Sequence, residues 1–279
     1  MLSVVLIAIF LAVLVFSSIF ATLGLGGACF YVPIFLWFGI PLNAAVPAGL
    51  FLNIITCSVA WYNCRKMFDL KTVFWIFIGT AIGAPLGAWL STIIPQKIII
   101  GIFAIVLSAG ACLMFFWKKK NDSAIVEETA YISSRQLNQI KKVLVGAATG
   151  IISGLLGIGG GLFLVPFLIA CGFAPNRAAA ISFPIVFFAS ALGLLSHIAV
   201  ATQFDVCKFH EFTYSCDQIA GHLDYNLMLL TGAAAFIGAF VGSWKMAQAG
   251  VANEEPIRRA FAIMLAIFAI KLAYDFLTV

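Results

Sequence analysis

Long apolar stretches separated by short polar segments make up most of this chain. The chain carries no charged residue before Arg65, and the long uncharged stretches after it are 72–96, 98–117, 143–176, 178–204, 225–244 and 260–270. A helix that crosses a membrane needs about 20 predominantly apolar residues, so each stretch suits one or two spans. The pattern predicts an all-α polytopic membrane protein with about eight transmembrane helices.

Glycines interrupt two of these stretches. Residues 2–38 are apolar throughout but are broken at residues 24–27. One straight helix of that length would be about 55 Å long, whereas the hydrocarbon core of a bilayer is about 30 Å thick. We therefore expect a long helix, an unwound glycine turn and a short half-helix that carries Pro33. Residues 143–172 repeat this plan around residues 157–161, with Pro166 in the half-helix.

The two glycine elements are copies of one motif. A shift of 133 positions pairs Gly24 with Gly157, Gly26 with Gly159, Gly27 with Gly160, Ala28 with Gly161, Phe30 with Phe163, Val32 with Val165 and Pro33 with Pro166. The duplication predicts two membrane repeats, residues 1–117 and 143–279, joined by a polar linker at 118–142, with a polar loop at 205–224. Four spans in each repeat would give both repeats the same orientation, whereas re-entrant glycine turns would make them inverted.

Small residues recur every fourth position in two of the predicted spans. Gly79, Gly83 and Gly87 share one helix face, as do three glycines in the broken helix of the second repeat, at 146, 150 and 154. Such faces let helix backbones approach closely in a membrane. We expect both faces to lie at helix–helix contacts.

Composition supports a membrane protein and gives it an orientation. The chain is 63% hydrophobic and 10% charged, with a mean hydropathy of +1.10, whereas soluble domains carry about 25% charged residues. The net charge of +5 lies in short loops, so it does not indicate nucleic-acid binding. With eight spans, ten Lys and Arg residues would face one side and five the other, which predicts that both termini are cytoplasmic.

The duplicated element G-x-G-G-[GA]-x-x-x-V-P, placed at the end of a broken first helix in each half, resembles the TauE/SafE family of sulfite exporters. The glycine-rich third and seventh spans and the basic loop after the second span resemble it too, so that the likeness covers nearly the whole chain. The resemblance implies a polytopic protein of two related halves that moves small sulfur-containing or organic anions across the plasma (inner) membrane.

The glycine turns are the candidate binding site. The N-terminus of each half-helix would present backbone N–H groups and roughly half a positive charge, which suits an anion. Broken helices of this kind build midplane sites in transporters, although the glycines could instead serve only close packing. The predicted substrate-binding residues are Gly24, Gly26, Gly27, Ala28, Pro33, Asn53, Thr56, Gly157, Gly159, Gly160, Gly161, Pro166 and Ser182.

Several other polar residues allow more than one interpretation. Asn53 lies inside a span and needs a partner, either an interhelical hydrogen bond or a ligand. His197 could relay protons or bond to a neighbouring group. Cys207, His210, Cys216 and His222 lack the spacing of a zinc module, so we expect no metal and no cofactor. No arrangement of residues indicates an enzyme.

The sequence therefore favours a secondary transporter or exporter of a small anion such as sulfite or an organosulfonate. The expected partners are that anion and the lipid bilayer, without nucleic acid, and a homo-oligomer is left open. Two alternatives stay in view: a non-transporting membrane scaffold that docks through its polar loops, and a passive anion channel.

Overall fold

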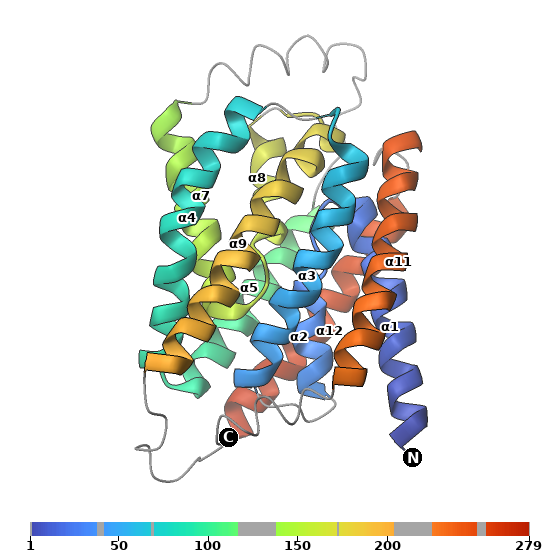
Figure 1. The fold of residues 1–279 in the computed structure, drawn as a ribbon, viewed down its shortest axis with the longest axis vertical. Coiled ribbons are helices and arrows are strands. Elements are labelled where there is room, and N and C mark those ends of the chain that lie inside the picture. Colours follow the sequence, from blue (N-terminus) through green and yellow to red (C-terminus); the bar gives the residue numbers. More distant parts are fainter. Residues whose placement is uncertain are drawn as a thin grey trace.

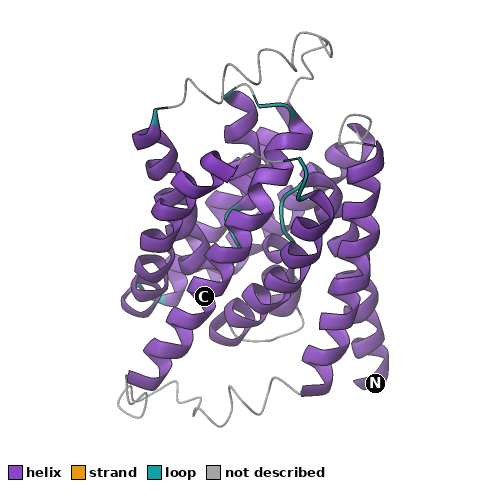
Figure 2. Ribbon diagram, turned by 45° about the horizontal axis from the view of Figure 1, so that its top comes forward, coloured by secondary structure: helices purple, strands orange, loops and turns teal. Residues whose placement is uncertain are grey.

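The computed structural model describes residues 2–37, 42–67, 70–116, 138–171, 173–203, 225–249 and 255–278. These residues form ten α-helices and no strand (Figures 1 and 2). The first half contains α1 (Leu2–Leu23), α2 (Ala28–Trp37), α3 (Leu42–Cys64), α4 (Leu70–Ile93) and α5 (Gln96–Phe116). The second half contains α7 (Gln139–Leu156), α8 (Gly161–Ala170), α9 (Pro175–Gln203), α11 (Tyr225–Ala249) and α12 (Glu255–Thr278). The predicted all-helical class is confirmed.

Both predicted glycine breaks are present. Helix α1 ends at Leu23 and α2 begins at Ala28, while α7 ends at Leu156 and α8 begins at Gly161. Residues with positive φ fill both breaks: Gly24 (76°), Gly26 (68°), Gly157 (70°), Gly159 (77°) and Gly160 (73°). Residues with a Cβ rarely adopt this conformation, which is why both turns are built from glycine.

Helix α1 runs parallel to α11. Gly238 of α11 lies against the backbone of Leu14, and Gly242, one turn later, lies against the backbone of Ser18. Residue numbers therefore increase in the same direction along both helices. No Cβ would fit at either glycine, so the two backbones are in direct contact.

Helix α3 also runs parallel to α11. Gly232 of α11 lies beside Ile55, and the Asn63 side chain donates a hydrogen bond of 2.8 Å to the Ser243 hydroxyl. Because α1 and α3 thus run in the same direction, α2 must carry the chain back between them. The segment formed by α1, the glycine turn and α2 is a hairpin, which we call the first hairpin.

The second half contains the corresponding hairpin, formed by α7, the turn at 157–160 and α8. Gly79 and Gly87 of α4 lie against the backbones of Val143 and Ile151 of α7, so α4 and α7 run parallel. Figure 1 shows α4, α7 and α9 all descending in the view, while α1, α3 and α11 ascend. The second hairpin therefore enters from the end opposite to the first.

These helix directions distinguish between the two chain paths that the sequence allows. The sequence left open whether each glycine turn is a broken span or a re-entrant hairpin, and the helix directions correspond to hairpins. The two halves therefore run in opposite directions rather than in the same one. Both chain ends lie at the lower end of Figure 1.

Four described helices contain segments long and apolar enough to cross a membrane: Ala45–Cys64, Leu70–Ile93, Gln139–Leu156 and Pro175–Ala199. The count of about eight spans stays a prediction. Helix α7 begins at Gln139, so the last residues of the expected 118–142 linker are helical. The 205–224 loop, with its Cys and His residues, lies outside the described residues.

The predicted glycine faces are confirmed as a helix contact. They meet along α4 and α7, where a Cβ on Gly83 would collide with the Ala147 carbonyl and one on Gly150 would lie 2.8 Å from the Thr80 carbonyl. Close approach of this kind replaces side-chain packing by backbone packing. The contact joins α4 of the first half to α7, the first helix of the second half, so it holds the two halves together.

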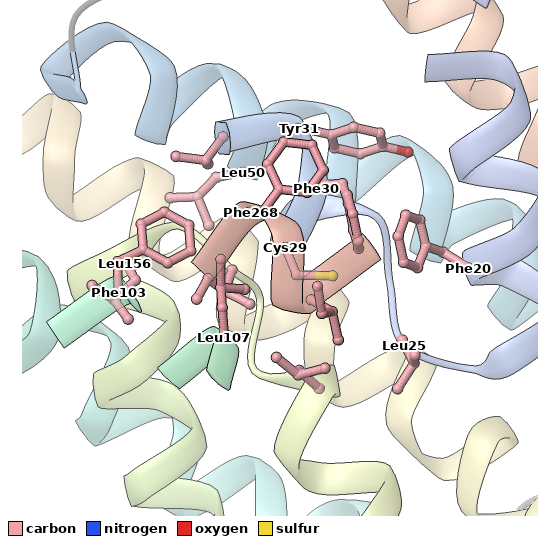
Figure 3. Close-up of a cluster of buried hydrophobic side chains, with 14 of the residues drawn as sticks. Phe20, Leu25, Cys29, Phe30, Tyr31, Leu50, Phe103, Leu107, Leu156 and Phe268 are labelled. Atoms are coloured by element: carbon pink, nitrogen blue, oxygen red, sulfur yellow. The ribbon is translucent and has the colours of Figure 1, made fainter. Parts of the chain in front are cut away.

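A buried aromatic and aliphatic cluster includes residues of the first hairpin together with residues of other helices (Figure 3). The rings of Phe30 in α2 and Phe268 in α12 meet edge to face, with centroids 5.1 Å apart. Phe103 and Leu107 of α5 are fully buried in the same cluster. Ring contacts with Phe268 therefore join the half-helix α2 to α12.

Candidate functional site

Each glycine turn packs against the long helix that follows the other turn. A Cβ on Gly24 would collide with Ala179 of α9, and one on Gly157 would lie 2.9 Å from Val46 Cγ1 of α3. Ala179 follows Val46 by 133 positions, as Gly157 follows Gly24. The two turns therefore meet at the centre of the molecule through equivalent contacts.

The carboxamide of Asn53 in α3 lies between the two turns. A Cβ on Gly26 would lie 2.6 Å from Asn53 Oδ1, and one on Gly159 would collide with Asn53 Nδ2. Val186 of α9 touches both turns as well, since its Cγ1 would lie 3.0 Å from a Cβ on either of these glycines. Gly26 and Gly159 are thus needed for space as well as for backbone conformation.

Hydrogen bonds tie the fully buried Asn53 to both halves of the chain. Its Oδ1 accepts the Gly27 N–H at 2.8 Å, and its Nδ2 donates to the Ser190 hydroxyl of α9 at 2.7 Å. Two roles were open for Asn53 from its position in a span, interhelical partner or ligand contact, and the structure shows the interhelical one. At the start of α2 its amide oxygen accepts the kind of backbone hydrogen bond that an anion oxygen would accept.

Ser182 and Thr56 support the site from its two long helices. The Ser182 hydroxyl of α9 is fully buried and bonds to the Gly24 carbonyl and, at 2.7 Å, to the Ala179 carbonyl. The Thr56 hydroxyl of α3 bonds to the Tyr31 hydroxyl at 2.9 Å. Ser182 therefore fixes the first turn, whereas Thr56 fixes α2 one turn beyond it.

The remaining predicted residues belong to the half-helices themselves. Ala28 and Gly161 begin α2 and α8, and a Cβ on Gly161 would collide with the Leu25 carbonyl of the opposite turn. Pro33 and Pro166 lie inside the half-helices, in the second turn rather than the first. Both half-helices therefore carry the proline that the sequence predicted for them.

Comparisons with known proteins identify the family of this chain. The family model described as "Sulfite exporter TauE/SafE" matches residues 9–272. The chain belongs to the TauE/SafE family. No solved structure matches it.

Two relatives of this TauE/SafE protein are named as transporters. "Probable membrane transporter protein MJ0441" of Methanocaldococcus jannaschii is 30% identical over 189 residues, which cover 64% of this chain and 67% of that protein. "Probable membrane transporter protein YunE" of Bacillus subtilis is 25% identical over 250 residues, which cover 82% of this chain and 84% of that protein. The family and these relatives make the chain a membrane transporter.

His197 of α9 lies beside the last turn of α7 in this TauE/SafE protein. Its Nε2 is 2.9 Å from the carbonyl oxygen of Gly154, in the last turn of α7 before the glycine turn. The structure therefore gives His197 the neighbour bond that the sequence offered as the alternative to a proton relay. Within the described ranges, no group of three or more His, Cys, Asp or Glu side chains could hold a metal ion.

Sequence reasoning missed Tyr31. This fully buried residue belongs to the first turn of α2 and holds it to α3 through Thr56. The signal was available, because a tyrosine hydroxyl in an otherwise apolar half-helix needs a partner when it is buried.

Replacing Asn53 by leucine is expected to destabilise this transporter by about 3 kcal/mol, because it leaves the buried Gly27 N–H without an acceptor and Ser190 without its donor. Thermal unfolding of the purified protein in detergent measures the loss. Asn63→Leu is the matched control, since the Asn63 amide donates one hydrogen bond and is partly exposed. Equal losses in both variants would contradict a central bracing role for Asn53.

Proposed function

We propose that this TauE/SafE protein is a secondary transporter or exporter of a small anion, such as sulfite or an organosulfonate, across the plasma (inner) membrane. One observation carries the proposal: two glycine hairpins from opposite ends of the molecule meet at a single buried carboxamide. At that point the N–H of Gly27, immediately before α2, donates to an acceptor oxygen, that of Asn53. An arrangement that presents helix N-termini at the middle of a helical membrane protein suits an anion.

The proposed architecture consists of two inverted repeats, residues 1–117 and 143–279, joined by the polar linker at 118–142. Each repeat would comprise one hairpin and three long helices. The opposite directions of the halves and the equivalent contacts of Gly24 and Gly157 support this arrangement. Inverted repeats place a substrate site at their interface, near the middle of the bilayer.

The proposed substrate site is lined by backbone groups. Its members are the predicted glycines, Ala28 and the residues that begin α2 and α8, while Asn53, Ser182 and Thr56 hold them in place. The N-terminus of a helix carries roughly half a positive charge, so an anion can be bound without a cationic side chain. A small oxyanion fits this set because its oxygens accept hydrogen bonds in several directions.

Alternating access would arise from movement of one repeat against the other around the central turns. The membrane potential would drive export, because an anion that leaves a cell with a negative interior gains about 2.3 kcal/mol per charge for each 100 mV. The names of the two relatives, both probable membrane transporter proteins, support a transport function for this chain.

The hairpins change the proposed orientation. The count of ten Lys and Arg residues on one side against five on the other assumes that each glycine turn lies within a span that crosses the membrane. Grouped by the helix directions of the structure, 13 of the 16 Lys and Arg residues flank the linker end, and the other end carries Lys97, Lys208 and Lys271. Because cytoplasmic ends are enriched in Lys and Arg, we place the linker in the cytoplasm and both termini on the opposite side.

Reporter fusions test this orientation. Alkaline phosphatase, which folds only outside the cytoplasm, is expected to be active when fused behind residue 279, whereas green fluorescent protein at that place is expected to be dark. Fusions within residues 121–130 of the linker should give the reverse pattern. A fluorescent C-terminal fusion would contradict this orientation and would indicate that the termini are cytoplasmic.

Counterflow in proteoliposomes tests the proposed function against its two alternatives. Vesicles loaded with unlabelled sulfite are expected to accumulate labelled sulfite transiently, because a carrier exchanges the two. A passive anion channel would equilibrate the label without an overshoot. A scaffold would move no label, and deletion of the 205–224 loop would abolish binding of its partner rather than flux.

A further inference from the structure

The first hairpin is filled by aromatic rings. Phe16 and Phe20 of α1 pack on Phe30 in the first turn of α2, with ring centroids 5.4 Å and 4.8 Å away. Phe20 and Phe30 are fully buried, and both lie in the cluster of Figure 3. The face of α1 that looks at the start of α2 is therefore apolar and occupied.

The second hairpin has small hydroxyl residues at the same positions. Thr149 and Ser153 of α7 follow Phe16 and Phe20 by 133 positions. A Cβ on Gly160 would collide with the Thr149 methyl group and lie 2.9 Å from the Thr149 carbonyl, so this part of α7 borders the start of α8. Ser153 is one turn later on the same helix face. Both hydroxyl residues therefore face the N-terminus of α8.

Ser153 has a buried hydroxyl that makes no hydrogen bond. Its side chain is fully buried, and among the buried side-chain polar atoms of the described residues its Oγ is the one without a partner. Other buried hydroxyls in these helices donate to a carbonyl three or four residues earlier, as those of Ser17, Thr56, Thr80 and Ser243 do. Because an unpaired buried hydroxyl is unfavourable, the Ser153 hydroxyl is a donor that a bound ligand would pair.

The backbone N–H groups at the two turns also differ: one is bonded within the protein and its equivalent, among the described residues, is not. The Gly27 N–H is taken by Asn53, but the equivalent long-helix position in the second half is occupied by Val186, which has no polar group. Across the described part of the chain, no hydrogen bond is formed by the equivalent N–H, that of Gly160. The start of α2 is therefore capped by the protein, whereas the start of α8 is open.

We propose that the anion binds at one of the two hairpins only, at the N-terminus of α8, where the Ser153 hydroxyl and the Gly160 N–H donate hydrogen bonds to it. This inference rests on the proposed anion transport and makes its site asymmetric. The α1–α2 hairpin is a structural counterpart, plugged by Phe16, Phe20 and the Asn53 carboxamide. Since residues 143–176 contain no charge, the α8 half-site suits a small oxyanion of low charge, such as bisulfite or a sulfonate.

The Ser153→Ala variant tests the inference by two readouts that should move in opposite directions. Loss of a hydrogen bond to a charged ligand should raise the KM for sulfite about tenfold. Removal of an unpaired buried hydroxyl should leave the Tm of the anion-free protein unchanged or higher. Addition of sulfite should raise the Tm of the wild-type protein and have much less effect on the variant.

Ser243→Ala is the matched control, because the Ser243 hydroxyl is equally buried but bonds to the Ala239 carbonyl and to Asn63. This variant should have a lower Tm and an unchanged KM. Ser153→Thr, which keeps the hydroxyl, should recover most of the sulfite affinity.

The possible failures are distinguishable. An unchanged KM and an unchanged sulfite-induced Tm shift in Ser153→Ala would overturn the asymmetric site while leaving the transport function standing. Wild-type protein that shows the Ser153-dependent Tm shift but no flux would support the site and overturn the transport function. Absence of both flux and Tm shift in the wild-type protein would overturn both.

Discussion

Leucine in place of Gly160 is expected to lower sulfite flux about 100-fold or more, the order of loss that a misplacement of about 1 Å at a reacting or binding centre produces. Gly160 has a φ of 73°, which disfavours any residue with a Cβ by about 1–2 kcal/mol. A side chain there would also collide with Thr149. The turn would shift and displace the N–H groups at the start of α8.

The Gly160→Leu protein should nevertheless insert and remain folded, because the turn contributes little to the helix contacts that hold the bundle together. Size-exclusion chromatography and flux are measured on the same preparation. Ala233→Leu, on an exposed position of α11, is the control for an added leucine and should transport normally. Normal flux in Gly160→Leu would remove the α8 turn from the site.

Leucine in place of Gly83 is expected to prevent folding rather than transport. A Cβ at Gly83 would meet the Ala147 carbonyl of α7 and lie 3.0 Å from the Ile151 nitrogen, both of which are backbone atoms that cannot turn away. The two helices would have to separate along their whole contact. We expect a destabilisation of at least about 4 kcal/mol, at the upper end of what single substitutions cause.

The measurement is the yield of monodisperse protein after extraction in mild detergent. Gly83→Leu should aggregate or be degraded, whereas Ala109→Leu, at an exposed position of α5, should purify like the wild type. A well-folded Gly83→Leu protein would show that the close contact between α4 and α7 is not required for the fold.

The pattern of apolar runs and glycines was sufficient to predict the helices and the two breaks. An apolar run without charges says where a helix lies, and clustered glycines say where it stops. The direction of the chain after each break could not be predicted, because it depends on contacts between the halves. Those contacts, such as Gly238 on Leu14 and Gly232 on Ile55, join residues that are far apart in the sequence.

The candidate site was predicted in part. The glycines and Asn53 do lie together, because one backbone geometry is used twice and a buried amide needs partners. The asymmetry was also present in the sequence, since Phe16 and Phe20 of the first half correspond to Thr149 and Ser153 of the second half. It could not be interpreted without the structure, because only the hairpin path shows that these positions face the start of each half-helix.

Uptake of labelled sulfite into proteoliposomes tests the central claim most directly, with sulfate, thiosulfate and a small sulfonate as competitors. The account predicts saturable uptake that at least one of the competing anions reduces and that the Gly160→Leu protein lacks. No flux of any of these anions, in vesicles where the protein is shown to be folded and inserted, would contradict it.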